Sequence, residues 1–489
     1  MPFERFGRHM KAKKGFLYYT TCFITGFAIL VFELLSFRML APYFGNSSIV
    51  IGTIINSILL ALAIGYYLGG SIADRKKSHD LIYQVILVSA VYIFLVYLTY
   101  PLFLKSIAGM PVIAGSLLAI VVLFFPPMIL LSFVPPYLIK LISSKDDIGI
   151  SSGKIFSLST LGSIMGGVFT TFFLIPFIGT KISVLVSAII LLLLGVAGLH
   201  SGRLLSLAVA FALLSPFAFS ARSESKIIYQ DESVYNIIAV EQDEDIFYLK
   251  LNDNIGHHSV TINDKTLLTG TYTDMHLLPY LFVDAKKVLV LGNGAGNIMM
   301  QVAAFSQAAI DGVEIDSEIT RVGEAYFGLA LDETHRVHHE DARVFLQKSK
   351  EKYDVIHVDL FAGNPYIPFH LATIEFFQLM YDRLADDGAL VVNYPRFIEN
   401  DEQLSGYYLG TVKKVFPSVI ASDEALYVFK KEISAAELRK VIGAEKPIGT
   451  MFIVARDALR KFRDVEPIPL SFSDDLAPVE MLTYQALKR

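Results

Sequence analysis

The chain has 489 residues, which is too many for one compact domain. Of these residues 53% are hydrophobic, and the mean hydropathy of +0.51 is too high for a purely soluble protein. Its net charge of −5 at pH 7 argues against a nucleic-acid partner. Its one cysteine, Cys22, excludes an intrachain disulfide and a cysteine-based zinc cluster, and we expect no metal site.

The apolar residues gather in the first 220 positions, which we expect to form a multi-pass α-helical membrane domain. Seven stretches approach or exceed the roughly 20 residues that a helix needs to cross a bilayer. They lie near 16–38, 50–72, 81–103, 112–142, 153–177, 180–200 and 204–220. The fourth contains two proline pairs, so it is either one kinked helix or two helices separated by a break. The fifth carries Gly162 and Gly166, a spacing that lets helices pack closely.

Lysine and arginine residues predict the orientation of this domain, because they collect in cytoplasmic loops. Three segments are basic, 1–15, 74–77 and 140–154, and two are almost uncharged, 42–48 and 177–180. The N-terminus is therefore expected in the cytoplasm, with the protein integral to the plasma (inner) membrane and the lipid bilayer as its partner. Seven crossings would leave the rest of the chain outside. Either 204–220 does not cross or the fourth segment crosses twice, and the sequence leaves both open.

We divide the chain into a membrane domain (1–222), a small antiparallel β subdomain (223–270) and an α/β domain (271–489). Apolar and polar residues alternate from 227 to 262, which is typical of half-buried strands. A helical stretch at 272–282 leads to a strand at 288–291, and helices and strands then alternate as in a doubly wound Rossmann-like sheet. The predicted later elements are 309–315, 317–327, 336–339, 341–349, 353–360, 371–385 and 388–394. Two further helical stretches and strands near 425–429 and 450–454 complete the chain.

A glycine loop marks the predicted ligand site of the α/β domain. Gly292, Gly294 and Gly296 lie between a buried strand and a helix, where glycine allows a sharp turn and leaves room for a ligand at the helix N-terminus. Glu314 follows about 20 residues later, where nucleotide-binding folds place an acid for ribose hydroxyls. The pattern therefore predicts a nucleoside-type ligand.

These residues resemble the spermidine synthase (aminopropyltransferase) family, a branch of the methyltransferase-like Rossmann fold. The resemblance runs from about Tyr229 to Tyr394 and rests on the segments 233–235, 292–296, 313–316, 340–343 and 353–359. The membrane half is similar to multi-pass proteins that carry such a domain, through Glu33, Arg38 and the segments 41–45, 65–70 and 73–75. The segment 473–480 resembles an acidic closing motif of that group. Asp474 and Asp475 either cap the helix after them or cover the active site.

The resemblance implies roles for the matching residues. The three glycines would lie near the methionine-derived part of the cofactor, and Glu314 would accept hydrogen bonds from both ribose hydroxyls. Asp341 would accept from the adenine amino group, and Ala342 would offer its backbone N–H to the ring. Asp359 would be the catalytic base that takes a proton from an amine nucleophile. Four further residues are expected to contact the substrate: Tyr235, Asn236, Tyr272 and Asp274.

Three positions depart from the family pattern. Ala295 and Ala362 stand where the family has aspartates for cationic groups, and Asn236 stands where it has glutamine. The donor is therefore either decarboxylated S-adenosylmethionine or S-adenosylmethionine, and the methyl group of Ala295 is expected to leave space for the donor's carboxylate.

Three functions follow from this reading. The leading one is a membrane-anchored transferase that moves an aminopropyl group to a polyamine or related amine. The first alternative is an S-adenosylmethionine-dependent methyltransferase acting on a lipid or membrane-proximal substrate. The second is a non-catalytic transporter or sensor with a nucleoside-binding domain. Any of the three is compatible with a homo-oligomer.

Overall fold

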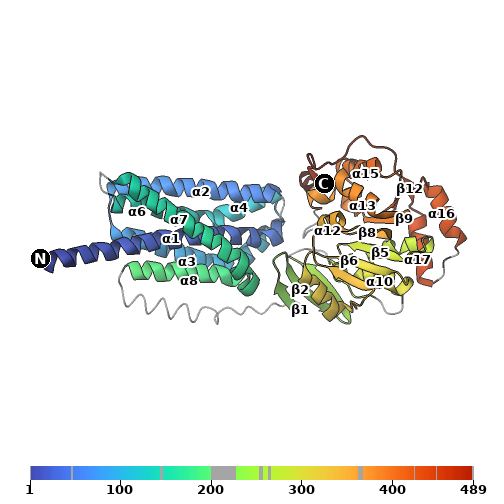
Figure 1. Ribbon diagram of the computed structural model, residues 1–489, viewed down its shortest axis with the longest axis horizontal. Helices are drawn as coiled ribbons and strands as arrows, with labels where there is room; N and C mark the ends of the chain where they lie inside the picture. Colours follow the sequence, from blue (N-terminus) through green and yellow to red (C-terminus); the bar gives the residue numbers. More distant parts are fainter. Residues whose placement is uncertain are drawn as a thin grey trace. The chain divides into compact units, whose positions relative to one another are not determined.

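The computed structural model describes residues 2–45, 48–143, 147–199, 227–252, 257–262, 266–361, 367–422, 424–445, 447 and 449–486. The chain forms two compact units, Met1–Glu224 and Ser225–Arg489. The first is helical and the second contains both sheets (Figure 1). The expected crossing at 204–220 lies outside the described residues.

The first unit consists of long apolar helices. Their bounds are α1 Pro2–Phe44, α2 Ser48–Arg75, α3 His79–Ile107, α4 Val112–Leu123, α5 Phe125–Ser132, α6 Val134–Ile142, α7 Ile148–Phe169, the π-helix η1 Thr170–Leu174, and α8 Ile175–Gly198. By length and composition, five described stretches could cross a membrane: 15–44, 49–75, 79–107, 125–142 and 148–198.

Prolines and one glycine explain where these helices break. The fourth predicted segment is divided into α4, α5 and α6, and each proline pair lies in the first turn of a new helix. Proline is tolerated there because the first N–H groups of a helix have no partner within it. Gly179, with φ 72° and ψ 171°, interrupts α8 near its start and separates the fifth and sixth predicted segments.

Polar contacts show that α1, α3 and α8 share one end of the bundle. The hydroxyl of Tyr18 in α1 lies 2.9 Å from Nδ1 of His79 at the start of α3. Nε2 of the same histidine lies 3.0 Å from the carbonyl oxygen of Gly198 at the end of α8. The described helices therefore return the chain, by residue 198, to the end of the bundle where residue 18 lies.

Close backbone packing holds α1 against α7. A Cβ atom on Gly162 would lie 2.1 Å from the carbonyl oxygen of Phe23, and one on Gly166 would lie 2.4 Å from that of Phe27. No side chain fits at these distances, so the predicted packing role of the small residues is confirmed.

The second unit begins with the predicted antiparallel sheet. Its strands are β1 Ile227–Glu232, β2 Ile237–Asp243, β3 Ile246–Leu251 and β4 Ser259–Val260, paired in that order. Their inner faces pack, through Ile238, Val240 and Leu249, against an apolar cluster that also contains Ala295.

The larger sheet has eight strands in the order β12-β10-β11-β9-β8-β5-β6-β7. The strands are β5 Lys287–Leu291, β6 Ala309–Val313, β7 His335–His338, β8 Tyr353–Val358, β9 Leu384–Asn393, β10 Ser418–Ser422, β11 Ala425–Phe429 and β12 Arg463–Asp464. The five from β9 to β7 are parallel, and the other three add antiparallel. The strand order reverses between β5 and β8, which is where ligands bind in such sheets.

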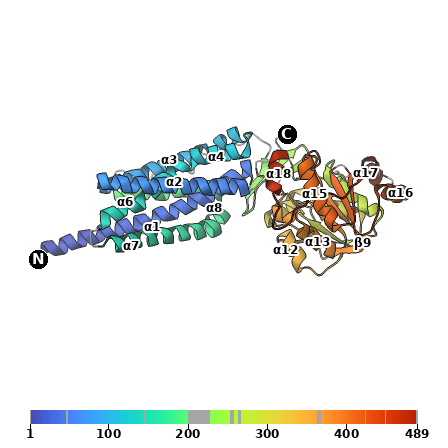
Figure 2. The ribbon, with the colours of Figure 1, turned by 90° about the horizontal axis from the view of Figure 1, so that it is seen from above.

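Helices cover both faces of this sheet (Figure 2). One face carries α12 Ala342–Lys348, α13 Ile374–Arg383, α15 Glu402–Val415 and α18 Val479–Ala486. The other carries the 3₁₀ helix η2 Tyr272–Leu281, α10 Asn297–Phe305, α16 Ala435–Ala444 and α17 Gly449–Leu459. Short elements complete the unit: α11 Ser317–Val322, the π-helix η3 Gly323–Phe327, the 3₁₀ helix η4 Phe369–Leu371 and α14 Arg396–Glu399.

The prediction for the last part of the chain is wrong in one element. The run 450–454, rich in β-formers, belongs to the helix α17 and not to a strand. Val454, Ala455 and Ala458 are all buried, and this spacing places them on one face of a helix that packs against the sheet. Tertiary packing therefore overrides the local preference. The strand predicted at 425–429 is confirmed as β11, whereas β10 was not predicted.

Labelling of single cysteines, introduced in a Cys22→Ser background, tests whether α1, α3 and α8 share one end of the bundle. In intact cells, Lys77→Cys and Leu199→Cys should be shielded from an impermeant maleimide, because both lie at the end predicted to be cytoplasmic. Gly109→Cys, in the loop between α3 and α4, should be labelled. Labelling of positions 77 and 199 from opposite sides of the membrane would contradict this arrangement. A further cysteine, at Ser225, would show on which side of the membrane the second unit lies.

Candidate active site

The glycine loop approaches the end of β8 closely. Gly292 has φ 81°, and a Cβ atom there would lie 2.0 Å from the carbonyl oxygen of Asp359. The N–H of Asp359 donates to the carbonyl of Leu291 at 2.9 Å. Gly294 and Gly296 also have positive φ, 53° and 92°. Glycine is thus required where the loops after β5 and β8 meet.

Glu314 lies just after β6, with 8% of its surface exposed. Its carboxylate accepts hydrogen bonds from the backbone N–H groups of Gly294, at 2.9 Å, and Asp316, at 3.1 Å. Burial raises the pKa of this carboxyl to about 7, although the two hydrogen bonds act in the opposite direction. Each carboxylate oxygen can accept a further hydrogen bond, so both remain able to bind a diol.

Asp359 lies immediately after β8, between two side chains from other elements. Its Oδ2 accepts a hydrogen bond from the hydroxyl of Tyr272, at 2.7 Å, and its Oδ1 accepts one from Nδ2 of Asn393, also at 2.7 Å. Burial raises the pKa of the carboxyl, and these two hydrogen bonds limit the increase. Tyr272 opens η2 and Asn393 ends β9. Sequence reasoning missed Asn393, for which the available signal was a polar residue at the carboxyl end of a strand.

Asp341 caps the first turn of α12. Its Oδ1 accepts from the backbone N–H groups of Arg343, at 2.9 Å, and Val344, at 3.1 Å. Its Oδ2 lies 3.4 Å from Nε2 of His370, and this contact lowers the pKa of the Asp341 carboxyl. Ala342 is buried at the first position of the same helix.

The acidic segment near the C-terminus joins this helix. Asp474 binds the guanidinium of Arg343 through both of its oxygens, at 2.8 and 2.5 Å, and accepts from the hydroxyl of Thr373 at 2.8 Å. Pro478 directly precedes α18, so the prediction that Asp474 or Asp475 caps that helix is wrong. Asp474 instead ties the C-terminal segment to the start of α12.

Asn236 links the small sheet to the strand end that carries Glu314. Its Nδ2 donates to Oδ2 of Asp316 at 3.0 Å, beside the hydroxyl of Ser233, which donates to the same oxygen at 2.6 Å. Tyr235 is 46% exposed beside them. The structure brings Asn236 close to the glycine loop through Asp316 and Glu314.

Asp274 supports the loop that carries Tyr272. Only 6% of it is exposed, and its oxygens accept from the N–H and hydroxyl of Thr269, the N–H of Gly270 and Nε2 of Gln301, at 2.6 to 2.9 Å. Protein donors therefore surround this carboxylate.

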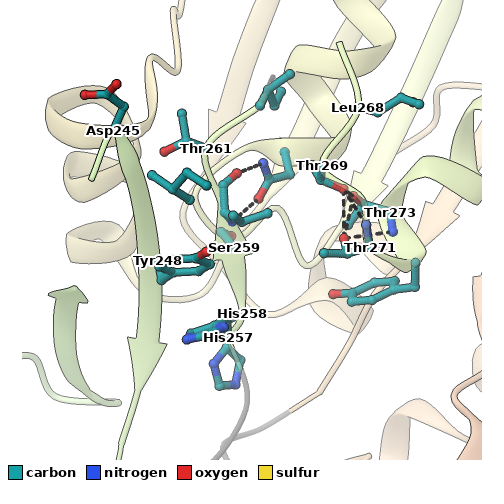
Figure 3. A pocket seen from close by; sticks show the side chains of 15 residues that line it. Asp245, Tyr248, His257, His258, Ser259, Thr261, Leu268, Thr269, Thr271 and Thr273 are labelled. Atoms are coloured by element: carbon teal, nitrogen blue, oxygen red, sulfur yellow. Dashed lines mark hydrogen bonds between the residues drawn. The ribbon is translucent and has the colours of Figure 1, made fainter. Parts of the chain in front are cut away.

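A cavity of about 410 Å³ lies beside Tyr272, between β3, β4 and the start of η2. Figure 3 shows the hydroxyls of Thr269, Thr271 and Thr273 gathered on one side of it, within 2.7 to 3.1 Å of one another. The Tyr248 ring packs on that of His257, with centroids 4.2 Å apart. Asp245 supplies the one carboxylate among the described residues that line the cavity. Hydroxyl and aromatic groups thus dominate its described wall.

A doubly wound sheet with a glycine loop, an acid after the second strand and a buried carboxylate at the switch point is typical of Rossmann-like folds that bind nucleosides. Residues 272–427 match the spermine/spermidine synthase domain. In this region the chain therefore resembles spermidine synthases, and homologous proteins are named polyamine aminopropyltransferases, a family of transferases.

Three relatives illustrate the extent of the similarity. A probable polyamine aminopropyl transferase of Bifidobacterium longum is 28% identical over 303 residues, which are 57% of this chain and 67% of the relative. The enzyme of Vibrio vulnificus is 33% identical over 196 residues, 38% of this chain and 64% of the relative. Polyamine aminopropyltransferase 2 of Aquifex aeolicus is 21% identical over 396 residues, 76% and 77% of the two chains.

Among solved structures, a probable spermidine synthase from Corynebacterium glutamicum aligns with a TM-score of 0.38 and 19% identity. The alignment covers 46% of this chain and 87% of that one.

From the raised pKa of Glu314, we expect an adenosyl ligand such as methylthioadenosine to bind more tightly as the pH rises. In the expected contact, ribose hydroxyls donate to the ionised carboxylate of Glu314. Because burial raises the pKa of this carboxyl to about 7 in the protein without ligand, the group must lose a proton before it binds at lower pH. Affinity measured by calorimetry should fall about tenfold between pH 8 and pH 6.

The Glu314→Gln variant should bind weakly and lose this pH dependence. Glu318→Gln, which changes an exposed carboxylate of α11, is the matched control and should behave like the wild type. A pH-independent affinity in the wild type would show that Glu314 does not hold the ligand.

Proposed function

We propose that the protein is a membrane-anchored transferase that moves an aminopropyl group from decarboxylated S-adenosylmethionine to a small-molecule amine. The observation that carries this proposal is the buried carboxylate of Asp359, held by Tyr272 and Asn393 where the strand order reverses. The names of the relatives, polyamine aminopropyltransferases, support the same chemistry.

The proposed step is a nucleophilic substitution at carbon. The amine nitrogen forms a bond to the propyl carbon next to the sulfonium, the carbon–sulfur bond breaks, and its electron pair stays on sulfur to give a thioether. The proton lost by the amine goes to Asp359. A raised pKa makes this carboxylate a stronger base, which favours proton transfer from an ammonium group.

Residues around Asp359 have separate roles in the proposal. Glu314 binds the ribose hydroxyls, Asp341 and the N–H of Ala342 bind the adenine ring, and Gly292, which no larger residue can replace, lies next to Asp359. A donor bound in this way would hold its sulfonium carbon within reach of the base, so that the reactants are oriented before the step.

The cavity beside Tyr272 is the proposed acceptor site. It opens between the small sheet and η2, and Tyr272 connects its wall to Asp359. The hydroxyl groups of its threonines accept hydrogen bonds from an ammonium group, and the ring of Tyr248 offers a face to a cation. We propose that Asn236 and Asp274 hold the walls of this site in place, while Tyr272 contacts the acceptor.

The first unit is proposed to lie in the lipid bilayer of the inner membrane, with its N-terminus in the cytoplasm. Large apolar side chains are exposed along its helices, for example Leu60 (56%), Tyr67 (76%), Leu102 (76%) and Phe156 (51%). Such surfaces are unfavourable in water but match hydrocarbon. An anchored transferase would act on an acceptor near the membrane surface.

Asp359→Asn should reduce turnover by about 10²- to 10⁴-fold, the range contributed by a general base, while donor affinity stays close to that of the wild type. The matched control is Asp354→Asn in the same strand, where the carboxylate accepts from the N–H groups of Lys286 and Lys287, away from the site. The measurement is formation of methylthioadenosine from decarboxylated S-adenosylmethionine and an amine. Full activity of Asp359→Asn would remove the carboxylate from the mechanism.

One observation favours methyl transfer from S-adenosylmethionine as a second candidate function. Ala295 is fully buried in an apolar cluster with Ile238 and Val322, so this position offers no acid to the free amine of a decarboxylated donor. Because this cluster packs around the methyl group of Ala295, the prediction that the methyl group leaves space for the donor's carboxylate is wrong.

We expect S-adenosylmethionine to bind at least as tightly as its decarboxylated form, because position 295 lacks a carboxylate that would repel one donor and attract the other. Paired calorimetric titrations of the inactive Asp359→Asn protein measure both affinities without turnover. A strong preference for the decarboxylated form would contradict this expectation and would favour aminopropyl transfer over methyl transfer.

A further inference from the structure

Three side chains of η2 contact one side chain of β8 and one side chain directly after it. The residues on η2 are Tyr272, His276 and Tyr280, each four positions from the next. Their partners are His357, near the end of β8, and Asp359, immediately after the strand and two positions from His357. The hydroxyl of Tyr272 donates to Asp359 at 2.7 Å. Nδ1 of His276 lies 3.0 Å from Nδ1 of His357, and the hydroxyl of Tyr280 lies 2.9 Å from Nε2 of His357. Two elements distant in sequence are therefore joined by consecutive polar contacts.

Both imidazoles are buried, with 1% of His276 and none of His357 exposed. Burial lowers the pKa of His276 to about 3 and that of His357 well below its usual range, so both rings are neutral at neutral pH. Two neutral Nδ1 atoms at 3.0 Å require one ring to donate and the other to accept, which defines a tautomer for each ring. This directional contact has no part in the proton transfer assigned to Asp359.

We propose that His276, His357 and Tyr280 are positioning residues that hold η2 in register on β8 and thereby keep the Tyr272 hydroxyl on Asp359. Elsewhere η2 meets the sheet side through the hydroxyl of Tyr427, which donates to the carbonyl of Met275 near the start of η2, and through apolar residues such as Leu277 and Leu278. Apolar contacts tolerate a shift along the strand, because they have no preferred direction, whereas the hydrogen bonds of the histidine pair do not. We call His276, His357 and Tyr280 the histidine lock.

The histidine lock should control the pKa of the Asp359 carboxyl. The hydrogen bond from Tyr272 lowers the pKa of Asp359, against burial, which raises it. The other groups near this network are Asn393 on β9, Glu424 before β11, which acts on Tyr272, and Tyr427 on β11, which donates to the carbonyl of Met275. Asp274 lies on η2 itself. Substitutions in the histidine lock remove none of these groups, so the expected consequence of displacing Tyr272 is loss of its hydrogen bond and a higher pKa of Asp359.

The inference rests on the proposed function for its kinetic readout. Asp359 must be ionised to accept a proton, so a higher pKa moves the acid limb of the pH profile of kcat/KM to higher pH. We expect His357→Leu to move this limb upward by about one pH unit, as Tyr272→Phe does, since each removes the same charged hydrogen bond. The double variant should show no further shift, and KM for the donor should change little.

Two variants separate positioning from general stability. Leu438→Ala, in α16 of the same apolar core, should lower the melting temperature without moving the acid limb. His276→Asn, which keeps a polar amide near the place of Nδ1, should retain most of the wild-type profile. Tyr280→Phe removes only a hydroxyl, and it supplies the test if His357→Leu does not fold.

A ¹³C NMR titration of the Asp359 carboxyl measures the same pKa without turnover. If the wild type transfers no group to any amine, the proposed function fails, but a higher Asp359 pKa in His357→Leu still supports the histidine lock. An unchanged Asp359 pKa in His357→Leu and in Tyr280→Phe, or shifts that add to that of Tyr272→Phe, would overturn it.

Discussion

The buried carboxylate of Asp359 is the constraint on which the second unit depends. A charge inside a protein requires hydrogen-bond partners, and here they come from η2 and β9, which flank the strand that carries it. The glycine loop must pass within contact of the same residue, which only Gly292 permits. The ends of β5, β8 and β9 therefore meet around Asp359, whose carboxylate needs hydrogen-bond donors.

The second unit builds the nucleoside side of the site in a similar way. Glu314 is the common acceptor for the glycine loop and for the turn after β6, while Asp316 connects that turn to the small sheet. A ligand that replaces part of these contacts would meet a carboxylate already oriented by backbone donors. Preorganisation of this kind lowers the entropic loss on binding. At the far side of the proposed adenine site, Asp474 holds the first turn of α12 through Arg343.

In the proposed bilayer location the first unit follows different physics, because apolar burial does not drive association between helices in hydrocarbon. Its helices approach where glycines remove side chains, as between α1 and α7, and a group of polar contacts around His79 joins three helices at one end. Polar groups are least costly near an interface, which is consistent with a bundle whose ends lie in water and whose middle lies in lipid.

The sequence by itself determined the features that depend on local chemistry. The glycine spacing, Glu314, and the alternation of strands and helices predict the Rossmann-like sheet that the structure contains, because turn geometry and side-chain periodicity are properties of neighbouring residues. The length of the apolar runs similarly marks the helical unit.

Only the tertiary structure decided which distant residues share a site. Asn393, the His276–His357 pair and the contact of Asp474 with Arg343 join positions that are 34 to 131 residues apart. The assignment of 450–454 to a helix and the return of α8 to the starting end of the bundle also depend on long-range packing. A parallel sheet brings together strand ends that are separated by whole helices, and no pattern of neighbouring residues specifies which side chains then meet.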